Sequence, residues 1–141
     1  MDMIKIKVVL DTNVLYAGLY SSRGASHQIL RALERGNVKI VLSTVLLFEY
    51  EYILKRNKTE LGLSDRDIEK VLDNLCRLGE HQKIYFLWRP YLSDSEDDHI
   101  LEVAVASGTK TIVTHNVKDF KGSEKFGIRV LTPRKLLEEI K

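Results

Sequence analysis

Residues 4–13 read IKIKVVLDTN, and this stretch joins a strand pattern to a polar cluster. Apolar residues alternate with lysines up to Val8, and the continuous apolar segment Val8–Leu10 follows. A strand that is apolar on both faces is typical of a parallel sheet that is covered by helices on both sides. We therefore expect a parallel strand from Ile4 to Leu10, with Asp11 at its carboxyl end.

Strand patterns alternate with helix patterns along the rest of the chain. A short helix is expected after Asp11, and longer ones at about 26–35, 44–58, 64–79, 93–107 and from 132 onward. Further strands are expected at 39–42, 83–88, 111–113 and 128–131. Strands and helices that alternate with short connections predict an α/β fold, namely a three-layer α/β/α sandwich around a mostly parallel sheet of about five strands.

Length and composition limit the class of protein. The chain has 141 residues, of which 44% are hydrophobic and 30% charged, as expected for a single globular domain over residues 1–141. The single cysteine excludes a disulfide scaffold and fits a reducing compartment. No apolar run approaches the ~18 residues of a membrane span, and the first residues lack a signal-peptide pattern. We expect a cytoplasmic protein with no membrane association, and the net charge of +2 indicates no class of partner.

Two acidic residues follow predicted strands. Asp11 ends the first strand directly, and Asp119 closes the polar segment THNVKD that follows the strand Thr111–Val113. In open α/β sheets, ligands bind in the crevice outside the carboxyl ends of the strands, so both are candidate site residues. Structural alternatives remain open: Asp11 could cap the next helix, and residues 114–119 could form a loop held by side-chain to backbone hydrogen bonds.

Two other carboxylates lie on helix faces that the spacing predicts to be apolar. The neighbours three and four positions from Glu49 are Val45, Leu46, Tyr52 and Ile53. An ionised carboxylate on such a face is costly unless a cation or hydrogen bonds compensate it, and the alternative is a buried Glu satisfied by Arg or by backbone groups. Asp97 is explained by the start of its helix, where anions are favoured, and Asp98 shares that explanation in part. Asp98 also shares its face with Leu101 and Val105, which directs it toward the core side, whereas Asp97 is more easily solvated.

Four carboxylates from four segments would thus converge on one edge of one sheet: Asp11, Glu49, Asp98 and Asp119. Like charges gathered there repel and raise each other's pKa unless a cation is bound. Hard oxygen ligands without cysteine select Mg²⁺ or Mn²⁺ rather than zinc. Such ions activate water and neutralise charge on a phosphoryl group, so the sequence predicts a metal-dependent phosphodiesterase.

Four elements in the same order resemble the PIN-domain family of ribonucleases. They are VLDTNVL at 9–15, Glu49 in its helix, DDHILEVA at 97–104 and IVTHNVKDF at 112–120. The similarity is strongest to small prokaryotic members, including VapC-type toxins of toxin–antitoxin pairs. It implies an α/β/α sandwich, a Mg²⁺- or Mn²⁺-dependent endonuclease acting on single-stranded RNA, an antitoxin partner and a homodimer.

The resemblance also implies roles for individual residues. Asp11, Glu49 and Asp98 would bind metal, and Asp119 would support the site as a ligand or through water. Thr114 would correspond to the threonine of the family's site.

Four further polar residues bear on this prediction. Asn13 is expected to orient the carboxylate of Asp11. Asn116 stands where family members often carry Asp, and the missing charge weakens the expectation of a second metal ion. Arg23, in a predicted loop near Asp11, is a candidate phosphate contact. His99 is expected on the surface, although it neighbours a candidate ligand.

Two other readings of the sequence stay open. A catalytically inactive PIN-like module that binds RNA or protein is favoured by Asn116 and opposed by the intact trio Asp11, Glu49 and Asp98. A haloacid-dehalogenase-like phosphatase is suggested by Asp11 but needs a second Asp two residues later, where Asn13 stands. No glycine spacing fits a P-loop or a dinucleotide-binding turn.

Overall fold

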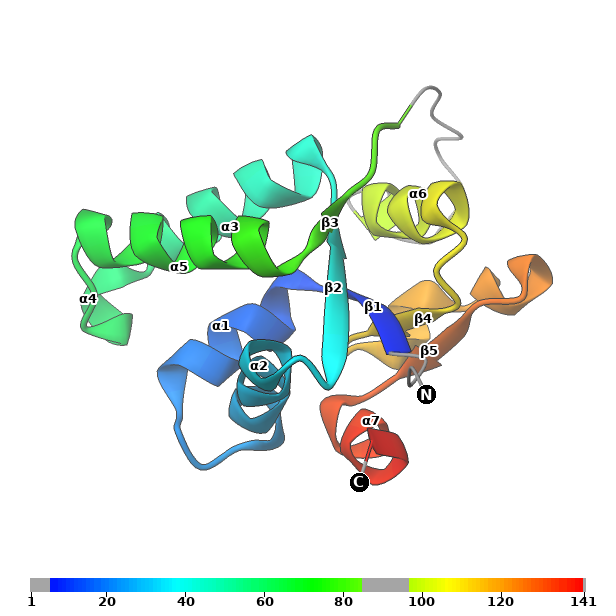
Figure 1. The fold of residues 1–141 in the computed structure, drawn as a ribbon, viewed down its shortest axis with the longest axis horizontal. Coiled ribbons are helices and arrows are strands. Elements are labelled where there is room, and N and C mark those ends of the chain that lie inside the picture. Colours follow the sequence, from blue (N-terminus) through cyan, green and yellow to red (C-terminus); the bar gives the residue numbers. More distant parts are fainter. Residues whose placement is uncertain (1–5, 85–96, 141) are drawn as a thin grey trace.

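Five strands form one sheet in the order β3-β2-β1-β4-β5, and all four pairings are parallel (Figure 1). The computed structural model describes residues 6–84 and 97–140. The strands are β1 (Ile6–Leu10), β2 (Val38–Leu42), β3 (Glu80–His81), β4 (Thr111–Val113) and β5 (Arg129–Leu131). The predicted sheet of about five parallel strands is confirmed.

Helices cover both faces of this sheet, which confirms the three-layer prediction. They are α1 (Thr12–Tyr20), α2 (Ala25–Arg35), α3 (Thr44–Arg56), α4 (Lys58–Leu61), α5 (Asp65–Leu78), α6 (Asp98–Ser107) and α7 (Pro133–Ile140), with 3₁₀ turns η2 (Val117–Phe120) and η3 (Ser123–Phe126). The chain moves from β1 to β2 to β3 in one direction and returns through α6 to β4. Because parallel crossovers are right-handed, α2 and α5 pack on β2 from one face, and α6 packs on β1, β2 and β4 from the other.

Local signals in the sequence set the ends of several helices. The Ser43 hydroxyl accepts a 3.1 Å hydrogen bond from the backbone N–H of Leu46 and begins α3. Ser64 and Asp67 form a reciprocal capping box at the start of α5. Gly108 ends α6 at φ 70°, a left-handed conformation that glycine adopts without strain.

The core fixes α3 to the end of β1. Val8, Val9 and Leu10 are fully buried, as the continuous apolar run predicts. The hydroxyl of buried Tyr50, in α3, donates a 2.5 Å hydrogen bond to the carbonyl oxygen of Leu10. This bond places Glu49, the residue before Tyr50, beside the residue after Leu10.

The third strand differs from the prediction at 83–88. β3 comprises Glu80 and His81, and Lys83 and Ile84 are not in a strand, while residues 85–88 lie outside the described residues. β3 pairs with Val41 and Leu42 at the end of β2, and the N–H of Gln82 reaches the Leu42 carbonyl at 2.7 Å. Since β2 ends at Leu42, a strand beginning at 83 would have had no partner along it.

The start of the sixth helix is also only partly described. The capping segment expected at 93–96 lies outside the described residues, and α6 begins at Asp98 with Asp97 in the N-cap position. Among the helices in residues 6–84 and 97–140, none has the length and apolar character that a membrane span requires.

Candidate active site

The strand order reverses between β1 and β4, and the candidate site lies at the carboxyl ends of these two strands. Such a reversal opens a crevice in which open α/β sheets bind ligands. Asp11 follows β1, Thr114 follows β4, and the N–H of Asp11 donates a 2.9 Å hydrogen bond to the Val113 carbonyl. The Thr114 hydroxyl then donates to Oδ2 of Asp11 at 2.7 Å, and both residues are buried.

Thr114 is the centre of a small hydrogen-bond network that positions Asp11. Its Oγ1 accepts from the side-chain amide of Asn13 at 3.4 Å and from the backbone N–H of Asn116 at 3.0 Å. Oδ1 of Asn13 accepts from the N–H of His115 at 3.3 Å. Asp11 occupies the N-cap position of α1 but makes no side-chain capping bond, so the capping interpretation is not supported. Its carboxylate faces the site instead.

Glu49 is held by one partner on each oxygen. The Thr12 hydroxyl donates to Oε2, and Nε2 of His99 donates to Oε1 at 3.0 Å. His99 is only 6% exposed, so the expectation of a surface histidine is wrong. Its Nδ1 is buried and has no hydrogen-bond partner among the described residues. Residues 98–104 are all buried, so this part of α6 is covered on every side. His99 is therefore buried whichever face of the helix it occupies.

The helix face around Glu49 differs from the prediction. Val45 and Tyr52 are 48% and 61% exposed, whereas α3 buries Leu46, Tyr50 and Leu54. The helix carries apolar residues on more than one face, so spacing alone did not identify the buried one. Glu49 is half-buried at the boundary, where hydrogen bonds rather than apolar packing surround its carboxylate.

The two carboxylates have pKa shifts of opposite sign. Burial raises the pKa of Asp11, and the charge of Glu49 adds to this against the lowering effect of the Thr114 hydrogen bond. For Glu49, burial also acts to raise the pKa, but the hydrogen bonds from His99 and Thr12 outweigh it and the net shift is downward. Glu49 is therefore the more readily ionised of the two, and a bound cation would most relieve Asp11.

One pocket of about 350 Å³ joins these groups. Its lining comprises Asp11, Thr12, Asn13, Tyr16, Glu49, Ile53, Asn57 and Asp97. Asp97, which the sequence assigned to the solvated helix start, thus lies on the pocket wall. Asp98, the predicted ligand, is the buried first residue of α6 and is not part of that lining. The pocket therefore brings together Asp11, Asn13 and Glu49 of the predicted set.

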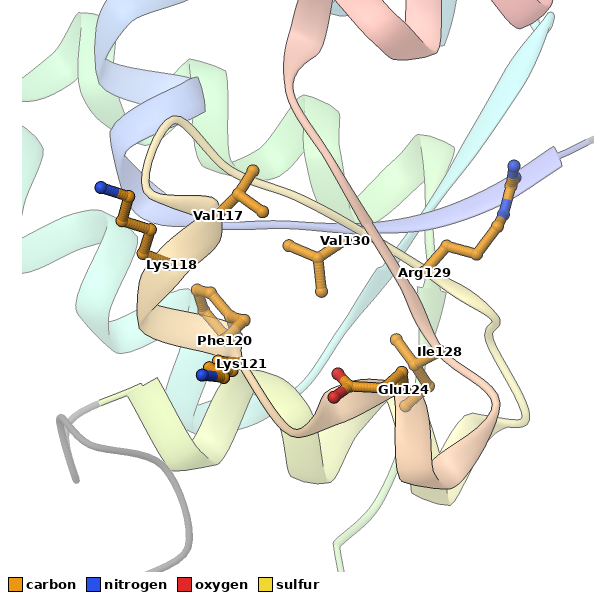
Figure 2. A pocket seen from close by; sticks show the side chains of 8 residues that line it. All are labelled: Val117, Lys118, Phe120, Lys121, Glu124, Ile128, Arg129 and Val130. Atoms are coloured by element: carbon orange, nitrogen blue, oxygen red, sulfur yellow. The ribbon is translucent and has the colours of Figure 1, made fainter.

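Two other predicted residues lie away from the lining of this pocket. Asp119 is half-buried in η2, and Arg23 is exposed in the loop between α1 and α2. A larger pocket, of about 680 Å³, opens between η2, η3 and β5 (Figure 2). Its walls are mostly apolar, with Lys118 and Lys121 at η2, and none of the predicted carboxylates lines it. Its size alone does not connect it to the chemistry of the acidic pocket.

The donor set suits a hard divalent cation. Within residues 6–84 and 97–140, no three side chains of His, Cys, Asp or Glu are arranged as a ready metal-binding group. The carboxylates that line the pocket are nevertheless oxygen donors of the type Mg²⁺ and Mn²⁺ prefer, and burial, the main cause of the raised pKa of Asp11, disfavours its charged form, which a bound cation would stabilise. The residues therefore fit a metal of this class, which would compete with Thr12 and His99 for Glu49.

The chain belongs to the PIN domain family, since the family model described as PIN domain matches residues 7–118. The predicted resemblance is thereby confirmed. A comparison with curated proteins gives no match.

Two solved structures share the fold. A chain of VapBC2 from Rickettsia felis, in a crystal structure with a DNA fragment from the promoter, is 19% identical with a TM-score of 0.62, over 90% of this chain and 98% of that one. PAE2754 from Pyrobaculum aerophilum is 16% identical with a TM-score of 0.57, over 96% and 89% of the two chains. At these identities the similarity establishes the architecture.

Proposed function

We propose that this PIN-domain protein is a Mg²⁺- or Mn²⁺-dependent endoribonuclease that hydrolyses phosphodiester bonds of single-stranded RNA. The observation that carries the proposal is that Asp11 and Glu49 line the same pocket, at the point where the strand order of the sheet reverses. A metal ion held there would supply an activated water and neutralise charge on the phosphoryl group. Membership of the PIN family favours this reading over a phosphatase of the haloacid-dehalogenase type.

Carboxylates from three or four segments of the chain would bind the metal. Asp11 and Glu49 would hold the metal, together with a carboxylate from the start of α6. The sequence assigns that role to Asp98, whereas the pocket lining favours Asp97. Asp119, in η2, does not line the pocket and would support the metal site as a ligand or through water.

The polar neighbours hold the carboxylates in place. Thr114 and Asn13 orient Asp11, and the backbone of Asn116 supports Thr114. Thr12 and His99 orient Glu49. Arg23, exposed in a loop beyond α1, would meet a phosphate of the RNA outside the pocket.

The proposed biological role is that of the toxin in a toxin–antitoxin pair. It is supported by family membership and by the fold shared with a chain of VapBC2. We accordingly propose an antitoxin protein and RNA as partners, a homodimer as the assembly and the cytoplasm as the location.

A second candidate is an inactive PIN-like module that binds RNA or protein. Two features favour it: Asn116 stands where members of the family often carry Asp, and both oxygens of Glu49 are already hydrogen-bonded. Binding of RNA without divalent-dependent cleavage would distinguish this module from the nuclease.

Incubation of the protein with unstructured single-stranded RNA tests the proposal directly. Parallel reactions contain Mn²⁺, Mg²⁺ or chelator, and Asp11→Asn and Asp98→Asn, purified identically, exclude contaminating nucleases. We expect metal-dependent cleavage by the wild type and its loss in Asp11→Asn. Equal cleavage by the wild type and Asp11→Asn would contradict the assignment of this site.

A further inference from the structure

The acidic pocket extends beyond its carboxylates along two helices. On α1, Thr12 and Tyr16 are four residues apart and line the same pocket. The same spacing of four residues occurs on α3, where the pocket is lined by Glu49, Ile53 and Asn57, the last of which ends the helix. Residues four apart share a helix face and are separated by about 6 Å along the axis. The pocket therefore continues from charged onto uncharged side chains over one to two helical turns.

Tyr16 is fixed in this outer part of the pocket. Its hydroxyl donates a 2.6 Å hydrogen bond to Oε2 of Glu60 in α4, and its ring stacks on Tyr20 with centroids 5.8 Å apart and planes 10° apart. The hydrogen bond to Glu60 raises the pKa of Tyr16, so the hydroxyl stays protonated and keeps donating. A ring held in this way loses little further conformational freedom when a ligand stacks on it.

Asn57 presents a fixed hydrogen-bond acceptor. Its Nδ2 donates to the carbonyl oxygen of Ile53 at 2.8 Å, which leaves Oδ1 available for a donor group of a ligand. The described residues that line the pocket include no Lys or Arg, so a second phosphate would find no counter-charge there. A neutral, planar group that carries an amino donor suits the chemistry of Tyr16, Ile53 and Asn57.

We propose that the outer part of this pocket is a nucleobase subsite. The base of the nucleotide whose phosphate lies at the carboxylates stacks on Tyr16, and its exocyclic amino group donates to Oδ1 of Asn57. Adenine, cytosine and guanine carry such a group, and uracil does not, so the subsite disfavours uracil at this position. The inference rests on the proposed nuclease function, because that function places a phosphate beside Asp11 and Glu49.

The experiment uses short single-stranded RNAs in which 2-aminopurine, a fluorescent adenine analogue quenched by stacking, occupies each position in turn. Each RNA is mixed with protein and Mn²⁺, fluorescence is followed in a stopped-flow instrument, and cleavage is measured on the same mixtures. The variants are Tyr16→Leu and Tyr16→Met, which remove the aromatic ring, and Tyr16→Phe, which removes only the hydroxyl. Tyr52→Leu is the matched control, since Tyr52 is an exposed tyrosine of α3 outside the pocket lining.

We expect quenching at one RNA position with the wild type, Tyr16→Phe and Tyr52→Leu. Tyr16→Leu and Tyr16→Met should abolish it and weaken RNA binding by roughly tenfold or more, as expected for the loss of one base stack. Uridine at that position should bind more weakly than adenosine, and Asn57→Ala should remove the difference. A folded Tyr16→Leu or Tyr16→Met protein that quenches and binds as the wild type does would overturn the proposal.

The two readouts separate this proposal from the proposed function. Quenching that depends on Tyr16 in a protein that cleaves no RNA would support the subsite and contradict the nuclease. Cleavage that depends on Asp11 without quenching at any position would support the nuclease and overturn the subsite.

Discussion

Thr114 and Asp11, which are 103 positions apart in the chain, share a 2.7 Å hydrogen bond between Oγ1 and Oδ2 at the point where the strand order reverses. The bond links the ends of β1 and β4 and is buried. It lowers the pKa of Asp11 against the opposing effect of burial. Thr114 therefore positions the carboxylate and partly offsets the rise in its pKa that burial causes.

Thr114→Val should keep the side-chain volume and remove this bond. A buried acceptor without its donor costs about 1–3 kcal/mol, so we expect a loss of that size in the free energy of unfolding, measured with urea. The pKa of Asp11 should rise further, and metal-dependent cleavage should fall. Thr111→Val, at the buried threonine that begins β4, should leave cleavage unchanged. Equal cleavage by Thr114→Val and Thr111→Val would contradict the positioning role.

Asp11→Asn should remove a pH dependence of stability in the metal-free protein. Burial holds the pKa of Asp11 in the folded state above 3.8, its ordinary value in an unfolded chain. Its contribution to stability is therefore fully present below pH 3.8 and is lost as the pH rises through the folded pKa. At neutral pH the variant should be at least as stable as the wild type. Urea unfolding in chelator from pH 3 to 7 measures this, and marked destabilisation of the variant at pH 7 would indicate a structural role for the ionised carboxylate.

The sequence predicted the architecture because its signals are local. The burial of Val8–Leu10 and the end of α6 at Gly108 are predicted from neighbouring residues alone, and both predictions are confirmed. The position of β3 depends on pairing with β2, whose residues Val41 and Leu42 lie 39 positions before their partners, and no local pattern encodes that register.

The candidate site was predictable to a similar extent. Asp11, Asn13 and Glu49 line one pocket as their positions after a strand and within a helix suggested. The sequence assigned the ligand role to Asp98, but Asp97 lies on the pocket wall. Which of the two faces the pocket depends on how α6 is rotated about its axis, and packing along the whole helix sets that rotation. His99 was missed because its partner, Glu49, is fifty residues away in the sequence.

Asp97→Asn and Asp98→Asn should differ in a way that identifies the third ligand. Asp98 is 2% exposed, so its replacement should lower the thermal stability of the metal-free protein. Asp97 is half-buried on the pocket wall, so Asp97→Asn should leave the metal-free melting temperature unchanged. It should instead reduce the rise in melting temperature that Mn²⁺ causes, because a ligand that binds only the folded state stabilises it. A full Mn²⁺ effect in Asp97→Asn and none in Asp98→Asn would restore the assignment made from the sequence.

His99→Ala should release Glu49 and change its titration. The hydrogen bond from Nε2 of His99 is the larger of the two that hold the pKa of Glu49 below 4.5, so the variant should titrate at a higher pH. In the wild type, the depressed pKa contributes stability that is present above pH 4.5 and is lost as the pH falls through the folded pKa, and this contribution should shrink in the variant. Carboxyl-carbon NMR of Glu49 measures the shift. His99→Gln, which keeps a side-chain donor, should retain part of the effect, and an unchanged Glu49 titration in His99→Ala would show that Thr12 alone holds the carboxylate.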